Sequence, residues 1–239
     1  MHRVAIVIPS RLDSVRLPRK PLAKIGNLTM IEHVVIAAKQ SRIESIYVAT
    51  DSEDIANLAQ LQGAKAIITN QECQSGTDRV FLATQLAALP HEVIINLQGD
   101  MPFVDHETID QVALMSLNEN YDITTAVAVA GQEYAQSKSN VKAIVDKFGR
   151  ALYFSRGMIP YNADRYLCHI GIYGFKRAVL QKFCSLPPSS LERFESLEQL
   201  RALENGMTIG ACIVKDMPIS VDTQIDLDDA IKYALSKNN

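Results

Sequence analysis

Apolar strand-like runs alternate with amphipathic helical segments along the first half of the chain. The expected strands are residues 4–8, 45–50, 64–68 and 93–97, and the expected helices are residues 30–40, a segment from the capping residues Asp51 and Ser52 to about Leu61, and residues 78–88. Parallel strands need crossover connections and are covered on both faces, so this alternation predicts an α/β fold with a mostly parallel sheet flanked by helices.

The pattern changes after Tyr121. Short strands are expected at residues 123–130, 143–145, 152–155 and 168–175, and helices at residues 191–204 and 224–235. The first of these helices ends at the stop signal Asn205-Gly206. No linker or repeat separates the two halves, so we expect one domain over residues 1–239 with a smaller secondary sheet.

Composition excludes several classes of function. The 239 residues are 47% hydrophobic, and 24 basic against 27 acidic side chains give a formal charge of −3. Such a chain can bury a sizeable core, but it has no global field that would attract nucleic acid or an anionic membrane. No apolar stretch approaches a membrane span, and the run that stops at Pro9 is too short for a signal-peptide core.

The cysteines indicate a reducing compartment. Cys73, Cys168, Cys184 and Cys212 are scattered, with no Cys-x-x-Cys pair and no histidine spacing that suits zinc. We therefore expect reduced structural thiols in a soluble, cytoplasmic protein.

A basic, proline-rich loop follows the first strand. Its cations are Arg11, Arg16, Arg19 and Lys20, and its prolines are Pro9, Pro18 and Pro21. Ligands of open α/β sheets bind at the carboxyl ends of the strands, so cations held there by rigid residues suit a polyphosphate. A solvated basic loop is the competing interpretation.

Three further clusters carry possible chemistry. They are Gln98-Gly99-Asp100 after the strand that ends at Leu97, Ser75-Gly76-Thr77-Asp78-Arg79 at a helix start, and Val221-Asp222-Thr223 late in the chain. A carboxylate beside a glycine at a sheet edge suits Mg²⁺ shared with nucleotide phosphates. The alternatives are a turn for Gly99-Asp100, and helix caps for the serine and aspartate clusters.

Together these motifs resemble the CMP-3-deoxy-manno-octulosonate (CMP-Kdo) synthetases, the cytidylyltransferases that activate the acidic sugar Kdo for lipopolysaccharide. The matching segments are Pro9 to Leu22, Gln74 to Arg79, Leu97 to Asp100, Ala151 to Arg156 with Ile159-Pro160, His169 to Tyr173, Glu195 to Arg201, and Val221 to Thr223. The family's fold is a Rossmann-type, nucleotide-diphospho-sugar transferase-like α/β fold, in agreement with the pattern above.

The resemblance implies a role for each motif. CTP would contact Pro9, Ser10, Arg11, Arg16, Lys20, Ser75, Gly76, Thr77 and Gln98. Asp100 and Asp222 would hold Mg²⁺ and, with Lys20 and Arg16, form the catalytic set. Gln98, Arg156, His169, Tyr173, Glu195, Glu198 and Gln199 would line the sugar pocket, where an arginine answers the substrate carboxylate. Approximately residues 1–120 and 205–239 would bind nucleotide, and approximately 121–204 would bind sugar and form a homodimer.

Some of these residues have simpler interpretations. His169 could be a satisfied core histidine and Tyr173 a core residue with a bonded hydroxyl. Ordinary salt-bridging residues on a helix surface are the alternative for Glu195, Glu198 and Arg201. The sequence also departs from the family pattern. Arg19 replaces the loop glycine, and Met101 stands where glutamate usually follows the metal aspartate.

The segment between Pro160 and His169 is shorter than in most members of the family, so the sugar could be Kdo or its 8-amino relative. Activation of another acidic sugar, such as a nonulosonate, and a non-catalytic CTP-binding protein remain alternatives.

Overall fold

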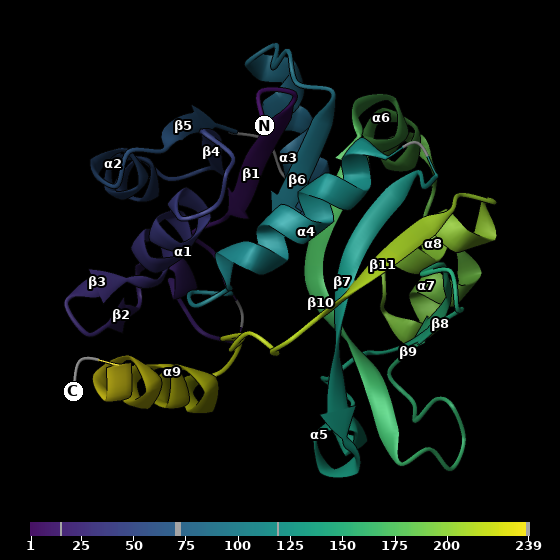
Figure 1. Ribbon diagram of the computed structural model, residues 1–239. Helices are drawn as coiled ribbons and strands as arrows, with labels where there is room; N and C mark the ends of the chain where they lie inside the picture. Colours follow the sequence, from purple (N-terminus) through teal and green to yellow (C-terminus); the bar gives the residue numbers. More distant parts are fainter. Residues whose placement is uncertain (15, 70–72, 119, 238–239) are drawn as a thin grey trace. The chain divides into compact units, whose positions relative to one another are not determined.

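The computed structural model describes residues 1–14, 16–69, 73–118 and 120–237 (Figure 1). Val15 of the basic loop lies outside the described residues. The chain divides into two units, Met1–Asp110 with Pro218–Asn239 and Gln111–Met217. The sequence pattern puts the change near residues 120 and 205, and the expectation that both parts form one domain stays a prediction.

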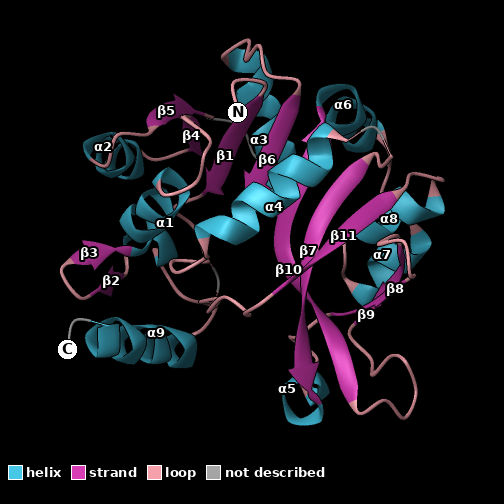
Figure 2. Cartoon of the chain, in the orientation of Figure 1, coloured by secondary structure: helices cyan, strands magenta, loops and turns pink. Residues whose placement is uncertain are grey.

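Four parallel strands form the sheet of the first unit, in the order β6, β1, β4 and β5 (Figure 2). Their bounds are β1 (Val4–Ser10), β4 (Ser45–Thr50), β5 (Lys65–Ile68) and β6 (Val93–Leu97). All seven residues of β1 are buried, as expected for a central strand of a parallel sheet that is covered on both faces. The carboxyl ends of these strands lie along one edge of the sheet, where Ser10, Asp51 and Gln98 follow or end them.

Helices and a hairpin complete the first unit. They are α1 (Met30–Lys39), α2 (Glu53–Leu61), α3 (Gly76–Leu86), α9 (Gln224–Lys237), the 3₁₀ helix η1 (Lys20–Leu22), and the hairpin of β2 (Lys24–Ile25) and β3 (Leu28–Thr29). Leu17, Ile25, Met30 and Leu227 share one apolar cluster, which holds the basic loop against α1 and α9. The residues of α4 (His106–Leu117) run across the boundary of the two units.

The second unit has a mixed sheet. Its strands are β7 (Ile123–Gly131), β8 (Lys142–Val145), β9 (Ala151–Ser155), β10 (Arg165–Lys176) and β11 (Ile209–Val214). Strand β7 pairs antiparallel with β10 and parallel with β11, and β8 pairs antiparallel with β9 and β10. Its short helices are α5 (Gln132–Gln136), α6 (Arg177–Ser185), α7 (Ser190–Glu195) and α8 (Gln199–Glu204).

A register shift interrupts the pairing of β10 with β7. Ile170 pairs with Ala126 and Tyr173 with Thr125, so Gly171 and Ile172 are extra residues on β10. Such a bulge re-aims the side chains on either side of it. His169 and Tyr173 flank this bulge.

The predicted α/β class is confirmed, with a largely parallel sheet flanked by helices and additional antiparallel pairs. One expected helix is wrong. Residues 191–204 form two helices, α7 and α8, because Ser196 adopts the left-handed conformation with φ 53° and ends the first of them. No helix among the described residues combines the length and apolar character that a membrane span requires.

Candidate active site

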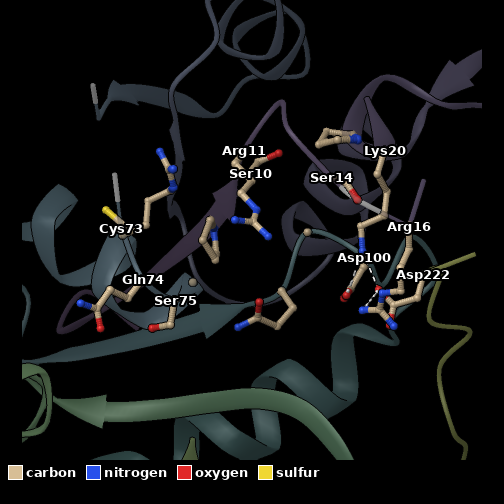
Figure 3. Close-up of a pocket in the computed structure, with 16 residues that line it drawn as sticks. Ser10, Arg11, Ser14, Arg16, Lys20, Cys73, Gln74, Ser75, Asp100 and Asp222 are labelled. Carbon is tan, nitrogen blue, oxygen red and sulfur yellow. Dashed lines mark hydrogen bonds and ion pairs between the residues drawn. The ribbon is translucent and has the colours of Figure 1, made fainter. Parts of the chain in front are cut away.

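A pocket of about 280 Å³ opens at the carboxyl ends of β1 and β6 in the first unit. Its lining residues are Pro9, Ser10, Arg11, Ser14, Arg16, Lys20, Pro21, Cys73, Gln74, Ser75, Gly76, Arg79, Gln98, Gly99, Asp100 and Asp222. In Figure 3, Lys20, Arg16, Asp100 and Asp222 gather at one end, Cys73, Gln74 and Ser75 lie at the other, and Ser10 and Arg11 lie between them. The pocket therefore brings together four motifs that are far apart in the sequence.

Lys20 joins the two acidic residues. Its Nζ lies 3.3 Å from Asp100 Oδ2 and 2.9 Å from Asp222 Oδ1, and an Arg16 Nη2 lies 3.1 Å from the same Asp222 oxygen. The side chain of Lys20 is 17% exposed, whereas that of Arg16 is 66% exposed. The ammonium is thus the better shielded of the two cations, and it is held between two carboxylates.

Local structure explains the position of each carboxylate. Asp100 follows β6 directly, and the Val221 N–H donates to the Asp100 carbonyl oxygen at 2.9 Å, which brings residues 221–223 to the same place. The last helix is capped by Thr223, because its Oγ1 and backbone N–H donate to Asp226 Oδ2 and the Asp226 N–H donates back to Oγ1. The interpretation of Asp222 as the N-cap is therefore wrong, and its carboxylate faces Lys20 and Arg16.

Burial raises the pKa of the Asp100 carboxyl above its usual value, and the neighbouring carboxylate of Asp222 raises the pKa further. The Lys20 ammonium acts in the opposite direction, but the net shift of the pKa is upward. An additional positive charge at this place would therefore favour the ionised form of Asp100.

The donor set suits a hard divalent cation. Two carboxylates face one pocket, and a cationic side chain already lies between them. Mg²⁺ is commonly bound by one or two carboxylates together with phosphate oxygens and water. Among the residues that the structure describes, no group of three or more His, Cys, Asp or Glu side chains could hold a metal ion, so the remaining ligands would come from nucleotide and water.

Ser10 presents an unsatisfied hydroxyl to the pocket. Its side chain is buried, and its Oγ has no hydrogen-bond partner among the described residues. Since buried polar atoms are normally satisfied, this hydroxyl is suited to a ligand atom.

The opposite end of the pocket is formed by the start of α3. Ser75 Oγ accepts from the Asp78 N–H, and Asp78 Oδ2 accepts from the Ser75 N–H, so the capping interpretation of this motif is correct. A Cβ on Gly76 would lie 3.1 Å from Gln98 Oε1 and 3.3 Å from Pro9 Cγ, which explains why this position holds glycine. Gly76 therefore lets α3 approach the strand ends closely.

Thr77 does not line the pocket. It is fully buried, and its Oγ1 accepts from Asn96 Nδ2 at 3.0 Å, while Asn96 Oδ1 accepts from Gln98 Nε2 at 3.1 Å. Thr77 is thus linked to Gln98 by two hydrogen bonds through Asn96. The predicted contact of Thr77 with nucleotide would have to be indirect in this arrangement.

Asp51 joins the basic loop to α3. Oδ1 of Asp51 accepts from the Leu12 N–H at 3.0 Å, and Oδ2 lies 3.1 Å from Arg79 Nη2. Of the two expected capping residues of α2, Ser52 is the N-cap, since its Oγ accepts from the Ile55 N–H, and Asp51 is not. Sequence reasoning missed the role of Asp51 at this site, although its place directly after a parallel strand was a usable signal.

Arg19 occupies a position that favours glycine. Its backbone is left-handed, with φ 55° and ψ 32°, and its guanidinium forms an exposed ion pair with Asp54 at 3.5 Å. The left-handed backbone at residue 19 explains why glycine is usual at this position in the family's loop. Met101 is buried, 3% exposed, and is therefore not displayed to the pocket.

The predicted sugar-side residues, Gln98 excepted, lie in the second unit. Tyr173, Glu198 and Gln199 line one small cleft together with Ile123, Phe175 and Phe183. Gln199 is buried, and its Nε2 has no partner among the described residues. Burial raises the pKa of the Tyr173 hydroxyl, and Glu198 adds to this effect, so the phenol stays protonated and can donate a hydrogen bond.

His169 packs against two aromatic rings in T-shaped and tilted arrangements. Its ring centroid lies 5.1 Å from that of Phe154 and 5.3 Å from that of Tyr173. Removal from water lowers its pKa to about 3, so the imidazole is neutral at physiological pH. The ring can therefore act in hydrogen bonding and not as a cation.

Hydrogen bonds of Arg156 and Glu195 join the end of β9 to the end of α7. The guanidinium of Arg156 donates to the backbone carbonyl oxygens of Glu195, Lys138 and Ser196, and the Glu195 carboxylate accepts from Ser155 Oγ and the Arg156 N–H. The buried Lys142 Nζ donates to the Arg156 carbonyl oxygen at 2.7 Å. Arg156 has five N–H donors, so this network leaves part of its guanidinium available.

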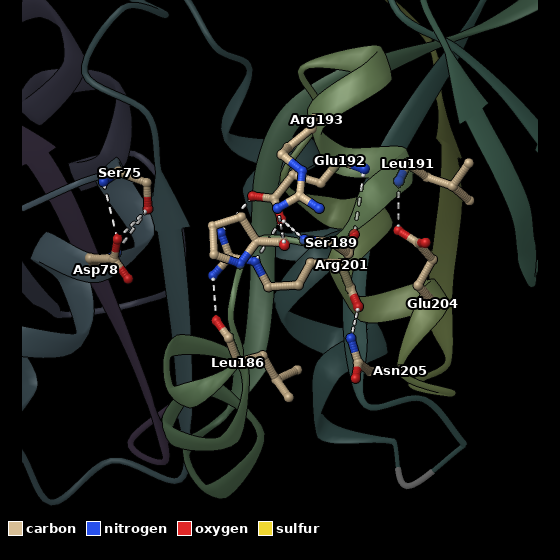
Figure 4. Close-up of polar contacts among 11 residues, drawn as sticks. Ser75, Asp78, Leu186, Ser189, Leu191, Glu192, Arg193, Arg201, Glu204 and Asn205 are labelled. Carbon is tan, nitrogen blue, oxygen red and sulfur yellow. Dashed lines mark hydrogen bonds and ion pairs between the residues drawn. The ribbon is translucent and has the colours of Figure 1, made fainter.

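Arg201 is not on a helix surface. It is 7% exposed, and it forms an ion pair with Glu192 and a hydrogen bond to the Leu186 carbonyl oxygen (Figure 4). Ser189 and Glu192 form the capping box of α7, so Arg201 connects α8 to the start of α7. The expected salt bridge is present, but it is buried.

Comparisons with known proteins agree with this geometry. A family model described as cytidylyltransferase matches residues 5–209. The 3-deoxy-manno-octulosonate cytidylyltransferase of Rickettsia typhi (strain ATCC VR-144 / Wilmington) is 50% identical over 234 residues, which are 97% of this chain and 97% of that protein. The protein of the same name from Rickettsia felis (strain ATCC VR-1525 / URRWXCal2) is 49% identical over 232 residues, covering 96% of this chain and 94% of its own length.

A solved structure extends the comparison to the fold. CMP:2-keto-3-deoxy-manno-octonic acid synthetase complexed with CTP superimposes with a TM-score of 0.92 at 36% identity, covering 98% of this chain and 99% of that one. Fold, pocket and relatives together define an enzyme of the nucleotidyltransferase class. Within that class, the chain belongs to the 3-deoxy-manno-octulosonate cytidylyltransferase family, as the resemblance of its motifs predicts.

Proposed function

We propose that this enzyme transfers CMP from CTP to Kdo in a Mg²⁺-dependent reaction that releases pyrophosphate, and so activates the sugar for lipopolysaccharide synthesis. The observation that carries the proposal is the cluster of Lys20, Asp100 and Asp222 at one end of the pocket in the first unit. The relatives' names and the CTP-bound neighbour support the choice of nucleotide and sugar.

The nucleotide is assigned to the pocket of the first unit. Its triphosphate would lie at the cationic end with Arg11, Arg16 and Lys20, and its base at the end formed by Ser75 and Gly76. The unpartnered Ser10 hydroxyl between these ends supplies a further hydrogen bond. Fixed cations around a phosphoryl group stabilise the charge that develops in the transition state.

Asp100 and Asp222 would hold Mg²⁺. When bound, the ion neutralises phosphate charge and orients the triphosphate for displacement. The carboxylates' own contribution is to place two oxygen ligands on one side of the pocket, and Lys20 keeps them together.

The sugar is assigned to the predicted sugar-side residues of the second unit. Arg156 retains donors for the substrate carboxylate, while Tyr173, Gln199 and the neutral His169 provide hydrogen bonds to hydroxyl groups. The anomeric hydroxyl then attacks the α-phosphorus of CTP and loses its proton to solvent, a new oxygen–phosphorus bond forms, and the bond to the pyrophosphate oxygen breaks. Positioning of the two reactants carries this reaction, so no protein nucleophile is needed.

The experiment measures pyrophosphate release with CTP and Kdo in the presence and absence of Mg²⁺. We expect turnover only when all three are present, and a loss of about two orders of magnitude or more for Asp222→Asn, because one metal ligand is removed. The matched control is Asp54→Asn, which changes an exposed carboxylate outside the pocket. Turnover without a divalent ion, or an Asp222→Asn enzyme of normal rate, contradicts the proposal.

The same assay defines the sugar. The unaltered enzyme is offered Kdo, its 8-amino analogue and a nonulosonate side by side. We expect the highest kcat/KM with Kdo, because the curated relatives at about half identity carry that substrate in their names. Preference for the 8-amino sugar would instead agree with the short segment between Pro160 and His169.

A further inference from the structure

The hydroxyl of Thr125 stands at the centre of the β7–β10 bulge. Thr125 is fully buried on β7, and its Oγ1 lies 2.7 Å from the Ile172 carbonyl oxygen, 3.2 Å from the Ile170 carbonyl oxygen and 2.9 Å from His169 Nε2. Three polar atoms of one strand thus converge on a single hydroxyl group of its neighbour.

The number of protons determines the direction of these hydrogen bonds. A threonine hydroxyl has one hydrogen and two acceptor lone pairs, whereas a carbonyl oxygen can only accept. The hydrogen of Thr125 must therefore point to the carbonyl oxygens, with the shorter contact to Ile172 as its main acceptor. Oγ1 is then an acceptor toward His169, and the Nε2 atom of His169 must carry a hydrogen to donate to it.

The other ring nitrogen is left as an acceptor. Nδ1 of His169 has no hydrogen-bond partner among the residues that the structure describes, and the rings of Phe154 and Tyr173 pack against the imidazole in T-shaped and tilted arrangements. The low pKa of this imidazole means that no second proton binds near neutral pH. His169 therefore offers one lone pair, at Nδ1, in a fixed direction.

We propose that Thr125 is a positioning residue that fixes His169 as the Nε2–H tautomer, so that Nδ1 accepts a hydrogen bond from a hydroxyl group of the sugar. The inference rests on the proposed function only for the identity of the ligand. The tautomer follows from the contacts of Thr125 alone. A neutral acceptor at this place also selects for a donor group on the substrate and against a carboxylate, because two acceptors facing each other are unfavourable.

The first experiment reads the tautomer directly, without substrate. The chain has five histidines, and nitrogen NMR of ¹⁵N-histidine-labelled protein distinguishes a protonated from an unprotonated ring nitrogen. The His169 signals are assigned by their loss in His169→Asn. We expect a protonated Nε2 and an unprotonated Nδ1 at neutral pH in the unaltered protein. A protonated Nδ1, or a mixture of tautomers, would overturn the proposal.

The second experiment changes the hydroxyl and keeps the shape. Thr125→Val is expected to raise the KM for the sugar about tenfold, the size of one hydrogen bond, and to leave the KM for CTP unchanged. In this variant the NMR signals should show that Nδ1–H becomes populated. Thr125→Ser keeps the hydroxyl and should restore both the tautomer and the KM, although it lacks the methyl group.

These outcomes separate the inference from a purely structural role. If the hydroxyl only supported the bulge, Thr125→Val would lower thermal stability and alter both KM values without changing the tautomer, and the proposal would be rejected. If Thr125→Val does not fold, the tautomer of the unaltered protein and the behaviour of Thr125→Ser decide the question. Failure of the proposed function appears differently, as an unaltered enzyme that turns over no acidic sugar.

Discussion

Asp100 is held in a charge state that its surroundings disfavour. Burial and the neighbouring Asp222 raise the pKa of its carboxyl, so the native protein binds this proton more tightly than the unfolded chain does. By linkage, the ionised carboxylate lowers the free energy of unfolding at neutral pH, and this cost disappears as the pH falls through the raised pKa toward the ordinary value of 3.8.

Asp100→Asn removes that charge and keeps the shape of the side chain. We expect the variant to be inactive, yet to have a higher free energy of unfolding than the unaltered protein at about pH 7, measured by urea titration without Mg²⁺ or nucleotide. The difference should shrink as the pH falls through the raised pKa of Asp100 and below its ordinary value of 3.8, where Asp100 is protonated in the native and the unfolded protein alike. Asp54→Asn serves as the control and should change stability little at either pH. A variant less stable at neutral pH would show that the pairing with Lys20 outweighs burial.

Arg19 offers a test of backbone strain. Its left-handed conformation, with φ 55°, is costly for any residue with a Cβ. Arg19→Gly and Arg19→Ala both remove the exposed ion pair with Asp54. The two variants therefore differ in the cost of the left-handed backbone conformation, and in the greater conformational freedom of glycine in the unfolded chain. We expect the glycine variant to be more stable than the alanine variant by about 1 kcal/mol, measured by thermal unfolding. Equal stabilities would contradict the assigned conformation.

Single residues of the site were predictable to different degrees. Lys20, Asp100 and Asp222 were identified from loop position and motif, and the structure brings their side chains together, while their part in binding Mg²⁺ stays a prediction. The sequence could not predict that Thr223 caps the last helix while Asp222 contacts Lys20, because either side chain can cap a helix. Only the three-dimensional path of the chain determines which of the two does so. Thr125 was missed for a similar reason, since a buried threonine in a strand has no distinctive sequence signal.

Strand β11 runs close to an aromatic ring. A Cβ on Gly210 would lie 2.7 Å from Cγ of Tyr121, a contact that real side chains do not make. Gly210→Ala should therefore destabilise the protein by about 1–3 kcal/mol through overpacking, seen as a lower urea midpoint with an unchanged slope. Gly131→Ala is the matched control at the end of β7, because a Cβ there would meet nothing within 4 Å. If both variants lose the same stability, the loss comes from the strand and not from the ring.

The elements of the first half could be predicted better than those of the second. The strands at residues 4–8, 45–50 and 93–97 are continuous apolar runs bounded by clear turn or cap residues, and all three are present as β1, β4 and β6. Helices α4 and α6 and strand β11 were missed, because short amphipathic or mixed segments carry weak periodic signals. The break between α7 and α8 depends on one left-handed serine, which no pattern of apolar spacing reveals.

The predicted assembly of two chains can be examined through the second unit. Its exposed apolar side chains include Leu152 on β9 and Ile213 on β11, which are 53% and 59% exposed, and these two strands are in contact. We expect the protein to sediment as a homodimer, and the double variant Leu152→Glu with Ile213→Glu to sediment as a monomer, because charge disfavours burial of this surface. Leu61→Glu, on an exposed position of α2, is the control and should remain a dimer. If the unaltered protein sediments as a monomer, the predicted homodimer is wrong.

The order of motifs made the whole chain's family recognisable from sequence, and the near-complete coverage of the relatives bears this out. The parallel sheet was predictable because each strand–helix step is local and repeats. The position of His169 and Tyr173 beside a bulge was not, because it depends on a two-residue register shift between distant strands.

The ammonium of Lys20, set between two carboxylates, makes the side chain a tethered counterion. The ammonium offsets the repulsion between the carboxylates of Asp100 and Asp222 when no nucleotide is bound. Screening by dissolved salt is therefore not needed to hold the two side chains close together. Lys20→Met should therefore lower both the stability of the nucleotide-free protein and its affinity for phosphate. The fall in rate of such a variant combines the separation of the two carboxylates with the loss of a charge that binds phosphate, and its thermal unfolding in the absence of nucleotide measures the first effect alone.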